Sequence, residues 1–302
     1  MRIGLIHGIK KVLGKNAIAI FYSSLGFLPD ESYIRLIYRL RMGKKPDLDD
    51  PRTFTGKLQW LKLNDHNPMY TKMADKLGMR GYVEKRIGAG HTVPVLGTWK
   101  RFEDIGFDSL PDRFVLKTTH DSGSYIICGD KSALDMKAAR KKLGRSLKRN
   151  YYRTTREWQY KDIEPRIIAE QYVTDGNAML TDYKFFCFNG RPVFMYMEQE
   201  ASDDPYQTIV DMDFRPMPFT MEDRKSSTMP EKPALFEEMK KYAARLSEGI
   251  PFLRVDMYCC GKTVYVGELT FYHYGGYIPF NPEEWDCKLG EMLDISEIRS
   301  RK

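Results

Sequence analysis

Residues 251–276, PFLRVDMYCCGKTVYVGELTFYHYGG, restrict the possible folds more than any other stretch of this sequence. Residues 252–258 and 263–270 are rich in Val, Leu, Tyr and Thr, which favour β-strands, and a glycine-containing break separates them. Two such runs around a short break predict a β-hairpin. We therefore expect an antiparallel pair of strands, apolar enough to belong to a core.

Charged and polar residues interrupt these two apolar strands. Arg254 and Asp256 are two positions apart, so their side chains lie on the same face of the first strand. Glu268 and Thr270 share a face of the second strand for the same reason. The four polar groups therefore converge if the register brings these two faces together.

The length of the hairpin loop decides that register, since directly opposed residues lie on the same face of a sheet. A two-residue turn at 260–261 would place Glu268 opposite Leu253, on the other face. A three-residue loop at 261–263 places Glu268 opposite Asp256 instead. We predict the three-residue loop.

Two carboxylates held close together repel each other unless a positive charge lies between them. Hard oxygen ligands suit a Mg²⁺ ion that bridges substrate phosphates. A solvated hairpin face with an Arg–Asp pair is the alternative, and this stretch alone leaves both interpretations open.

The charge of the whole chain gives a weaker indication of partners. The 302 residues include 48 Lys and Arg against 41 Asp and Glu, a formal charge of +7, which favours anionic partners such as nucleotides, acidic polymers, nucleic acids or membrane surfaces. The 42% hydrophobic and 29% charged content is ordinary for a soluble protein. The length suffices for one large domain or two to three small ones.

The cysteine pattern indicates a reducing environment. No CxxC pair occurs, and the five cysteines are Cys128, Cys187, Cys259, Cys260 and Cys287. Neither a disulfide framework nor a zinc site is expected, and a cytoplasmic location follows. We expect no membrane span and no signal peptide, because the sequence has no run of 18 apolar residues and no apolar segment ending in a cleavage site.

Residues 1–45 alternate basic and apolar side chains and predict helices with a basic face. Such a helix either packs on the body of the protein or lies on an anionic membrane surface, and both readings stay open. Residues 44–51, with two prolines and three aspartates, predict a linker.

Helices and short strands alternate after this linker. We expect helices from residue 53 to 88, including Lys76, and a helix at 132–148 that begins with Ser132 as its N-cap. Asn189-Gly190 predicts a tight hairpin turn between two strands. Two aromatic segments, 150–158 and 272–274, are compatible with either structural packing or substrate contact.

Lys117 ends a predicted strand beside a loop of small residues, 121–124. Glycine lets backbone N–H groups approach closely, and hydroxyls and a lysine supply further donors, so this pattern suits phosphate. It is neither a Walker A motif nor a Rossmann fingerprint. An ordinary hairpin loop of small residues is the alternative.

Taken in order, these pieces resemble the ATP-grasp superfamily, and within it the TupA-like group associated with teichuronopeptide and other cell-surface polysaccharides. The likeness covers roughly residues 52–290. It is carried by the stretches FTGKLQWLKLND, MADKLGMRGYV, RFVLKTTHDSG, PRIIAEQYV, DYKFFCFNG, FLRVDMY, GELTFY and FNPEEWD.

The resemblance implies an α+β protein with the ATP-grasp fold, in which two α+β subdomains clasp ATP. The expected parts are a basic helical extension at 1–50, a small N-terminal α/β subdomain at 51–110, a lid subdomain at 111–175 and a C-terminal subdomain with the metal site at 176–302.

The resemblance also implies roles for individual residues. Lys76, Lys117 and the loop Ser122, Gly123 and Ser124 would contact ATP phosphates, while Glu170, Gln171 and Val173 would meet adenine and Asp182 the ribose. Asp256, Glu268 and Thr270 would hold Mg²⁺, and Arg254 and Lys184 would be catalytic. Thr270 departs from the family, which usually has asparagine there, and this puts the number of metal ions in doubt.

The implied activity is an ATP- and Mg²⁺-dependent carboxylate–amine ligase that works through an acylphosphate. Its expected partners are ATP, an anionic sugar or polysaccharide carboxylate, and an amino acid or amino-sugar acceptor, with no nucleic acid. Residues 1–45 would allow contact with an anionic membrane, at its inner face. The alternatives are a phosphotransferase or glycosyltransferase-like enzyme of the same pathway, or a noncatalytic polysaccharide- or membrane-binding protein.

Overall fold

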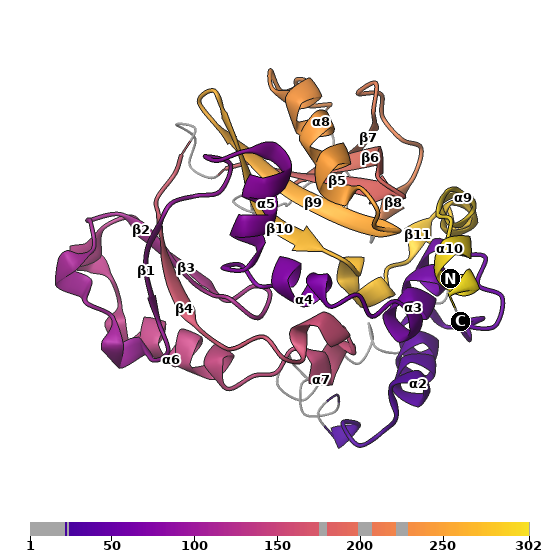
Figure 1. Cartoon of the computed structure of the whole chain (residues 1–302), viewed down its shortest axis with the longest axis horizontal. Coiled ribbons are helices and arrows are strands. Elements are labelled where there is room, and N and C mark those ends of the chain that lie inside the picture. Colours follow the sequence, from indigo (N-terminus) through magenta and orange to yellow (C-terminus); the bar gives the residue numbers. More distant parts are fainter. Residues whose placement is uncertain (1–21, 23, 175–179, 199–206, 222–228, 302) are drawn as a thin grey trace.

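Two antiparallel sheets form the centre of the protein (Figure 1). The computed structural model describes residues 22, 24–174, 180–198, 207–221 and 229–301. One sheet has four strands in the order β1-β4-β2-β3, and the other has five in the order β10-β9-β5-β6-β7. The sheets are built almost entirely from segments that the sequence predicts as strands, so the mixed α+β class is confirmed.

The four-stranded sheet consists of β1 (Val95–Trp99), β4 (Ile167–Gln171), β2 (Phe114–Thr118) and β3 (Tyr125–Cys128). Helix α6 (Met136–Leu147) packs on β2 through Ala139 and Leu143 and closes a separate apolar core. Asp135 caps this helix by accepting from the N–H of Ala138, so the predicted start at Ser132 is wrong.

The five-stranded sheet consists of β10 (Thr263–Thr270), β9 (Phe252–Cys260), β5 (Asp182–Phe188), β6 (Arg191–Glu198) and β7 (Gln207–Asp211). Helix α8 (Phe236–Ser247) covers one face of it, which leaves the other face free for polar side chains. The turn between β5 and β6 is Asn189-Gly190 with φ of 49° and 79°, the positive values that a tight hairpin requires, and this prediction is confirmed.

The hairpin of β9 and β10 has the predicted pairing but not the predicted turn. Its turn has two residues, Gly261 and Lys262, so the predicted three-residue loop is wrong. A β-bulge at Gly267 supplies the missing residue, because the register shifts between Val266 and Glu268. Glu268 therefore lies opposite Asp256, and the predicted pairing is confirmed.

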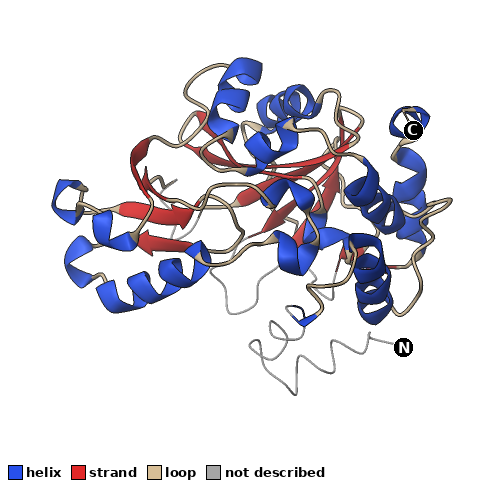
Figure 2. Ribbon diagram, turned by 60° about the horizontal axis from the view of Figure 1, so that its bottom comes forward, coloured by secondary structure: helices blue, strands red, loops and turns tan. Residues whose placement is uncertain are grey.

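The remaining elements surround these sheets, with the helices mainly on the outside (Figure 2). The other helices are α2 (Asp30–Met42), α3 (Phe54–Asn64), α4 (Met69–Ala74), α5 (Met79–Ile87), α7 (Tyr152–Thr155), α9 (Glu284–Met292) and α10 (Ser296–Ser300). Single 3₁₀ turns lie at Phe102–Asp104, Phe107–Ser109, Lys131–Ala133, Trp158–Tyr160 and His273–Gly276, and β8 (Thr220–Met221) pairs with β11 (Phe280–Asn281). Within the described residues, no helix is both long and apolar enough to cross a membrane.

Helix α2 packs on the body of the protein. Tyr33, Ile34, Ile37 and Tyr38 are buried on one side of it, and the Tyr38 hydroxyl hydrogen-bonds that of Thr55 on α3 at 2.8 Å. The packed reading is therefore confirmed for this part of the basic N-terminus. The predicted helix before it falls in residues 1–21, outside the described residues.

The predicted division of the chain at residues 50, 110 and 175 stays a prediction. Strand β1 precedes the boundary at 110 and pairs with β4, which follows it. The four-stranded sheet therefore includes residues on both sides of that boundary.

Candidate active site

A cavity of about 500 Å³ lies between the two sheets, a size typical of small-molecule sites. Eleven of the fourteen site residues that the sequence predicts line it, namely Lys76, Lys117, Ser122, Gly123, Ser124, Asp182, Lys184, Arg254, Asp256, Glu268 and Thr270. They come from segments up to 194 positions apart, since Lys76 and Thr270 are the first and last of them. The fold therefore brings most of the predicted site together.

One wall of the cavity is a row of side chains across the five-stranded sheet. Tyr196 is paired with Lys184, Lys184 with Asp256, and Asp256 with Glu268, on β6, β5, β9 and β10 in turn. Directly paired residues share a face, so this row points into one space. Arg254 and Thr270 are likewise paired, two positions along their strands.

Arg254 is held by two neighbours. Its guanidinium donates to both carboxylate oxygens of Asp256, at 2.7 and 2.5 Å, and its Nη1 donates to Nδ1 of His273 at 2.6 Å. Burial and the nearby Arg254 and Lys184 charges lower the pKa of His273, so its ring is the neutral acceptor that this contact requires. Burial raises the pKa of Asp256 to about 6, against the opposing effect of Arg254.

Lys184 forms an ion pair with Asp182 at 3.1 Å. Burial acts to lower its pKa, but the Asp182, Tyr196 and Asp256 charges outweigh burial, and the pKa is raised. Lys184 therefore remains a cation inside the cavity.

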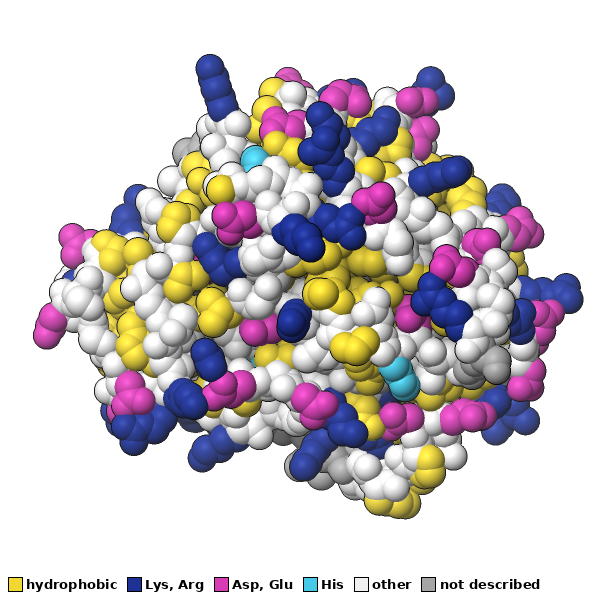
Figure 3. Space-filling view, viewed as in Figure 1, with side chains coloured by type: hydrophobic (Ala, Val, Ile, Leu, Met, Phe, Trp, Pro, Cys, Tyr) yellow, Lys and Arg dark blue, Asp and Glu magenta, His cyan; other side chains and the backbone are white. Residues whose placement is uncertain are grey.

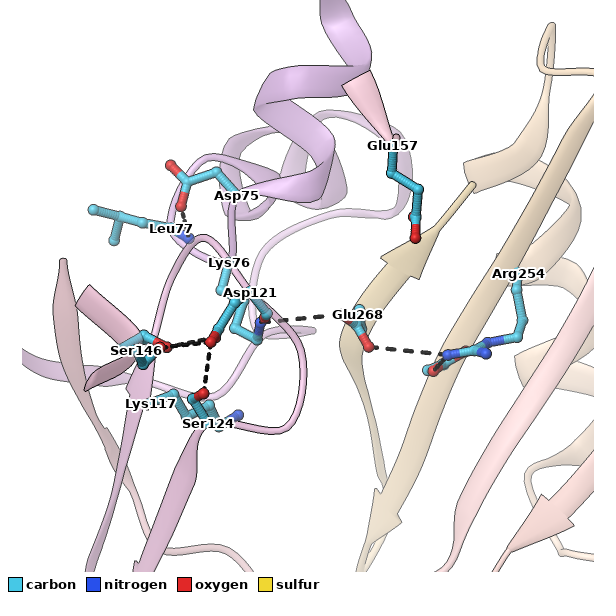
Figure 4. Close-up of polar contacts among 12 residues, drawn as sticks. Asp75, Lys76, Leu77, Lys117, Asp121, Ser124, Ser146, Glu157, Arg254 and Glu268 are labelled. Carbon is cyan, nitrogen blue, oxygen red and sulfur yellow. Dashed lines mark hydrogen bonds and ion pairs between the residues drawn. The ribbon is translucent and has the colours of Figure 1, made fainter. Parts of the chain in front are cut away.

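The opposite wall carries Lys76 and the loop that follows β2. The structure places Lys76 between α4 and α5, so its predicted helical position is wrong. The side chain of Asp75 accepts from the N–H of Leu77 and breaks the helix, and the Lys76 N–H donates to the carbonyl of Thr119. The Lys76 amine reaches the carbonyl of Asp121 and lies 4.0 Å from Glu268 across the cavity (Figure 4).

Asp121 fixes the base of this loop. Its buried carboxylate accepts from the hydroxyls of Thr118, Ser124 and Ser146 at 2.5 to 2.6 Å. Figure 4 shows the contacts to Ser124 and Ser146. Gly123 at the tip has a φ of +81°, which a residue with a side chain adopts only under strain. The loop is thus anchored at its ends and open at its tip.

The three predicted adenine-contacting residues do not line the cavity. Glu170 is buried and pairs with Lys117 at 2.5 Å, so it reaches the site through that lysine. The N–H of Gln171 donates to the carbonyl of Pro94, which leaves the carbonyl of Gln171 as its backbone group for a ligand. Val173 is half-buried just beyond β4.

The donor set of the row fits a magnesium ion. The Thr270 hydroxyl is buried and has no hydrogen-bond partner among the described residues. Glu268 has only the two long ion contacts at 3.9 and 4.0 Å among those residues, so its carboxylate is available. These hard oxygens, with Asp256, match the ligands that Mg²⁺ prefers, and no larger cluster of His, Cys, Asp or Glu suited to a metal is present among the described residues.

Several cavity residues lie outside the set that the sequence singles out. The cavity is also lined by Tyr125, Tyr151, Glu157, Tyr160, Tyr196, Gly267, Tyr272, Tyr274 and Gly275. Tyr151 and Glu157 belong to the segment 150–158, and Tyr272 and Tyr274 to the segment 272–274, so both ambiguous segments contact the cavity. The aromatic residues of these two segments are the sequence signal for contact with the cavity. No local sequence pattern marks Glu157.

Charged side chains of both signs are interspersed on the face seen in Figure 3. This face shows no extended field of one sign, in keeping with the modest formal charge of +7.

Comparisons with known proteins give one match by sequence family and several by structure. The model of the TupA-like ATP-grasp family matches residues 56–294. No curated protein matches the sequence.

Among solved structures, a D-alanine–D-alanine ligase from Bacillus anthracis complexed with ATP is 17% identical, with a TM-score of 0.44, and the match covers 77% of this chain and 69% of that one. The ATP-grasp ligase PsnB complexed with a minimal precursor is 13% identical, with a TM-score of 0.38 and coverage of 68% and 53%. The D-cycloserine synthetase DcsG is 15% identical, with a TM-score of 0.39 and coverage of 75% and 72%. This chain thus spans about half the length of PsnB.

These structural scores are too low to support an argument about function. The family match, by contrast, covers most of the chain and includes every residue in the predicted site. It agrees with the resemblance that the sequence shows, and the chain belongs to the TupA-like ATP-grasp family.

Proposed function

We propose that this protein is an ATP- and Mg²⁺-dependent ligase that joins a carboxylate to an amine through an acylphosphate. The observation that supports it best is the row of Lys184, Asp256 and Glu268, which faces Lys76 and Lys117 across one cavity. Cations on both sides of paired carboxylates suit a polyphosphate and its metal ion.

The nucleotide would lie between the two sheets. Lys76, Lys117 and the open tip of the loop, Ser122–Ser124, would contact its phosphates, and Asp182 its ribose. The Oε1 atom of Glu170 and the backbones of Gln171 and Val173 would meet the adenine edge. The Lys117–Glu170 pair would then fix the lysine relative to the base.

Asp256, Glu268 and Thr270 would hold magnesium. When bound, the ion would neutralise phosphate charge and polarise the γ-phosphoryl group. Arg254 would steady the transferred phosphoryl group, because Asp256 and His273 hold its guanidinium in a fixed orientation.

A carboxylate is a poor acyl donor because its charge repels nucleophiles. In the proposed reaction its oxygen attacks the γ-phosphorus, ADP leaves, and an amine then attacks the acyl carbon and displaces phosphate. These two steps need charge neutralisation and positioning of the substrates more than they need a protein nucleophile. The charged side chains of the cavity suit that need.

We propose that the acyl donor is a uronic acid or other sugar carboxylate and that the acceptor is an amino acid or amino sugar. The support is the TupA-like family together with exposed basic residues on α6, namely Lys137, Arg140, Lys141, Lys142 and Arg145, with Lys148 directly after the helix. Lys142 donates to the carbonyl of Tyr125, a cavity residue, so these basic residues begin next to the cavity.

Product analysis tests this proposal. Wild-type protein with Mg²⁺-ATP and glucuronic acid should release ADP and phosphate only when an amine is added, and Glu268→Gln should abolish release while circular dichroism stays unchanged. A phosphorylated sugar without free phosphate would indicate a kinase instead. Absence of Mg²⁺-dependent ATP binding in calorimetry would indicate a noncatalytic binding protein.

We also propose a cytoplasmic protein that contacts the inner face of an anionic membrane through its N-terminus. Because α2 is packed, the membrane-binding part would be residues 1–21, which alternate basic and apolar side chains. Removing residues 1–21 should abolish sedimentation with anionic vesicles and leave ATP binding intact. Equal sedimentation of both proteins would contradict this role.

A further inference from the structure

Three of the four acids that line the cavity lie near a cation. Asp182 pairs with Lys184, Asp256 with Arg254, and Glu268 lies 4.0 Å from Lys76. Glu157 is the fourth acid in the lining, and it forms no ion pair with any residue in the described ranges.

Lys62 on α3 is a buried cation whose charge acts on Glu157, but it does not supply that partner. Its ammonium donates to Oε1 of Gln59 at 3.0 Å and to the carbonyls of Thr155 and Gly275 at 3.1 and 2.7 Å. An ammonium group has three protons, so these neutral acceptors take all of them. Lys62 therefore offsets the charge of Glu157 from a distance without neutralising it by contact.

The position of Glu157 is fixed by its neighbour in the chain. Arg156 has a φ of 56° at the end of α7, and it does not line the cavity. Its guanidinium donates to the carbonyls of Gly26 and Leu28 and stacks on Tyr33 at 4.3 Å. Glu157, the next residue, does line the cavity.

The Glu157 carboxylate points into the space that Glu268 and Arg254 also face (Figure 4). Its residue is only 3% exposed, and its side chain accepts a long hydrogen bond of 3.3 Å from the amide of Gln159. A buried carboxylate without a cation is unfavourable, and binding a cation there removes that cost. Burial raises the pKa of Glu157 to about 7, with Lys62 opposing the shift, so the group can also exchange a proton near neutral pH.

We propose that Glu157 binds the amine of the acceptor substrate, pairing with it as an ammonium group and accepting its proton when it attacks. This inference rests on the proposed ligase function and names the chemistry of its second substrate. The acceptor is a primary amine that enters as a cation, rather than an alcohol or a neutral amide.

The ammonium loses one proton to Glu157 and becomes a free amine, whose nitrogen attacks the acyl carbon of the acylphosphate. The C–N bond forms, and the bond between the acyl carbon and the bridging oxygen of the phosphate breaks. Inorganic phosphate leaves with the electron pair of that bond. The amide nitrogen releases its second proton to solvent or phosphate.

A binding experiment tests this without requiring turnover. Thermal unfolding of the Mg²⁺-ADP-loaded protein is compared for wild type, Glu157→Gln and the control Glu84→Gln, an exposed acid on α5. The probes are two matched pairs, glucosamine with N-acetylglucosamine and glycine with N-acetylglycine. At least one amine probe should raise the unfolding midpoint of wild type and of Glu84→Gln, its acetylated partner should not, and Glu157→Gln should lose the response.

The inference is overturned if no amine probe acts on wild type, or if Glu157→Gln responds as wild type does. In turnover, Glu157→Gln should raise the KM for the amine by roughly 30-fold or more, the loss expected when a buried charge loses its partner, with no change in the Kd of Mg²⁺-ATP. An unchanged amine KM would also overturn it. Failure of the ligase proposal itself is distinguishable, because wild type would then release no phosphate in response to an added amine.

Discussion

Asp256 and Glu268 are direct cross-strand neighbours on β9 and β10, and the bulged residue Gly267 is what aligns them. The two-residue turn alone would put Glu268 one position out of register, with its side chain on the other face. The bulge restores the alignment next to the site, where both carboxylates reach the cavity. One residue without a side chain thus determines whether the proposed metal ligands meet.

Gly267→Val tests that dependence. A Cβ at Gly267 would lie 2.9 Å from a ring carbon of Tyr258, so the bulge must shift and Glu268 with it. We expect the Kd of Mg²⁺-ATP in calorimetry to rise about tenfold or more, with about 1–3 kcal/mol lost from the free energy of unfolding. The control Gly144→Val places its Cβ in open space on α6 and should change neither value. Unchanged affinity in Gly267→Val would contradict the role given to the bulge.

Arg254→Lys keeps the positive charge and removes the planar fork that grips Asp256. We predict that kcat falls about 100-fold, the usual loss for one donor to a transition state, while the Kd of Mg²⁺-ATP changes little. Steady-state ADP release measures the first and calorimetry the second. The exposed Arg245→Lys on α8 should behave as wild type, and equal kcat in both variants would remove Arg254 from the mechanism.

Lys62→Met should destabilise the protein by about 3–5 kcal/mol, because it leaves the buried charge of Glu157 without its distant counter-charge and removes three hydrogen bonds. Urea unfolding followed by fluorescence measures this change. Lys72→Met, on the exposed side of α4, should stay within about 0.5 kcal/mol of wild type. Equal midpoints for the two variants would show that the Lys62 network contributes nothing.

The pH dependence of stability should report Glu157. Its pKa is about 7 in the folded protein, raised by burial, and about 4.3 in an unfolded chain. Between these values the folded state holds a proton that the unfolded chain has released, so the contribution of this group to stability is full below about pH 4 and is lost as the pH rises toward 7.

Glutamine does not titrate, so Glu157→Gln should not lose stability in this way as the pH rises. The free energy of unfolding of this variant, relative to wild type, should therefore increase from pH 5 to pH 7.5 in urea titrations. Glu84→Gln should show no such trend, and a constant difference for Glu157→Gln would indicate an unperturbed carboxyl group.

The sequence predicts the strands of both sheets well because their apolar and β-branched runs are local signals. It predicts the pairing of Glu268 with Asp256 for the wrong reason, since hydrophobic patterning constrains the face of a strand and says little about turn against bulge. Lys76 shows the same limit. The helical spacing around it continues, and only the Asp75 side chain, bonded to the next turn, ends the helix.

The candidate site is predictable where a residue type has few other uses inside a core. Arg254, Asp256 and Glu268 stand out in apolar strands for that reason. Glu157 does not, because it follows a basic, aromatic segment in which an acid looks ordinary. Its burial depends on Arg156, α2 and Lys62, contacts that span up to 131 positions and leave no local pattern.

The hydrogen bonds of Arg156 to the carbonyls of Gly26 and Leu28 connect the residue next to Glu157, the proposed amine site, to a surface segment near the start of the chain. Proteolytic cleavage there would release Arg156 and let Glu157 move, while Lys76 and Lys117 would keep their positions. Under the proposed roles, the cleaved protein would still bind nucleotide but would select poorly among acceptors, so loss of selectivity would be an early sign of damage at its N-terminal end.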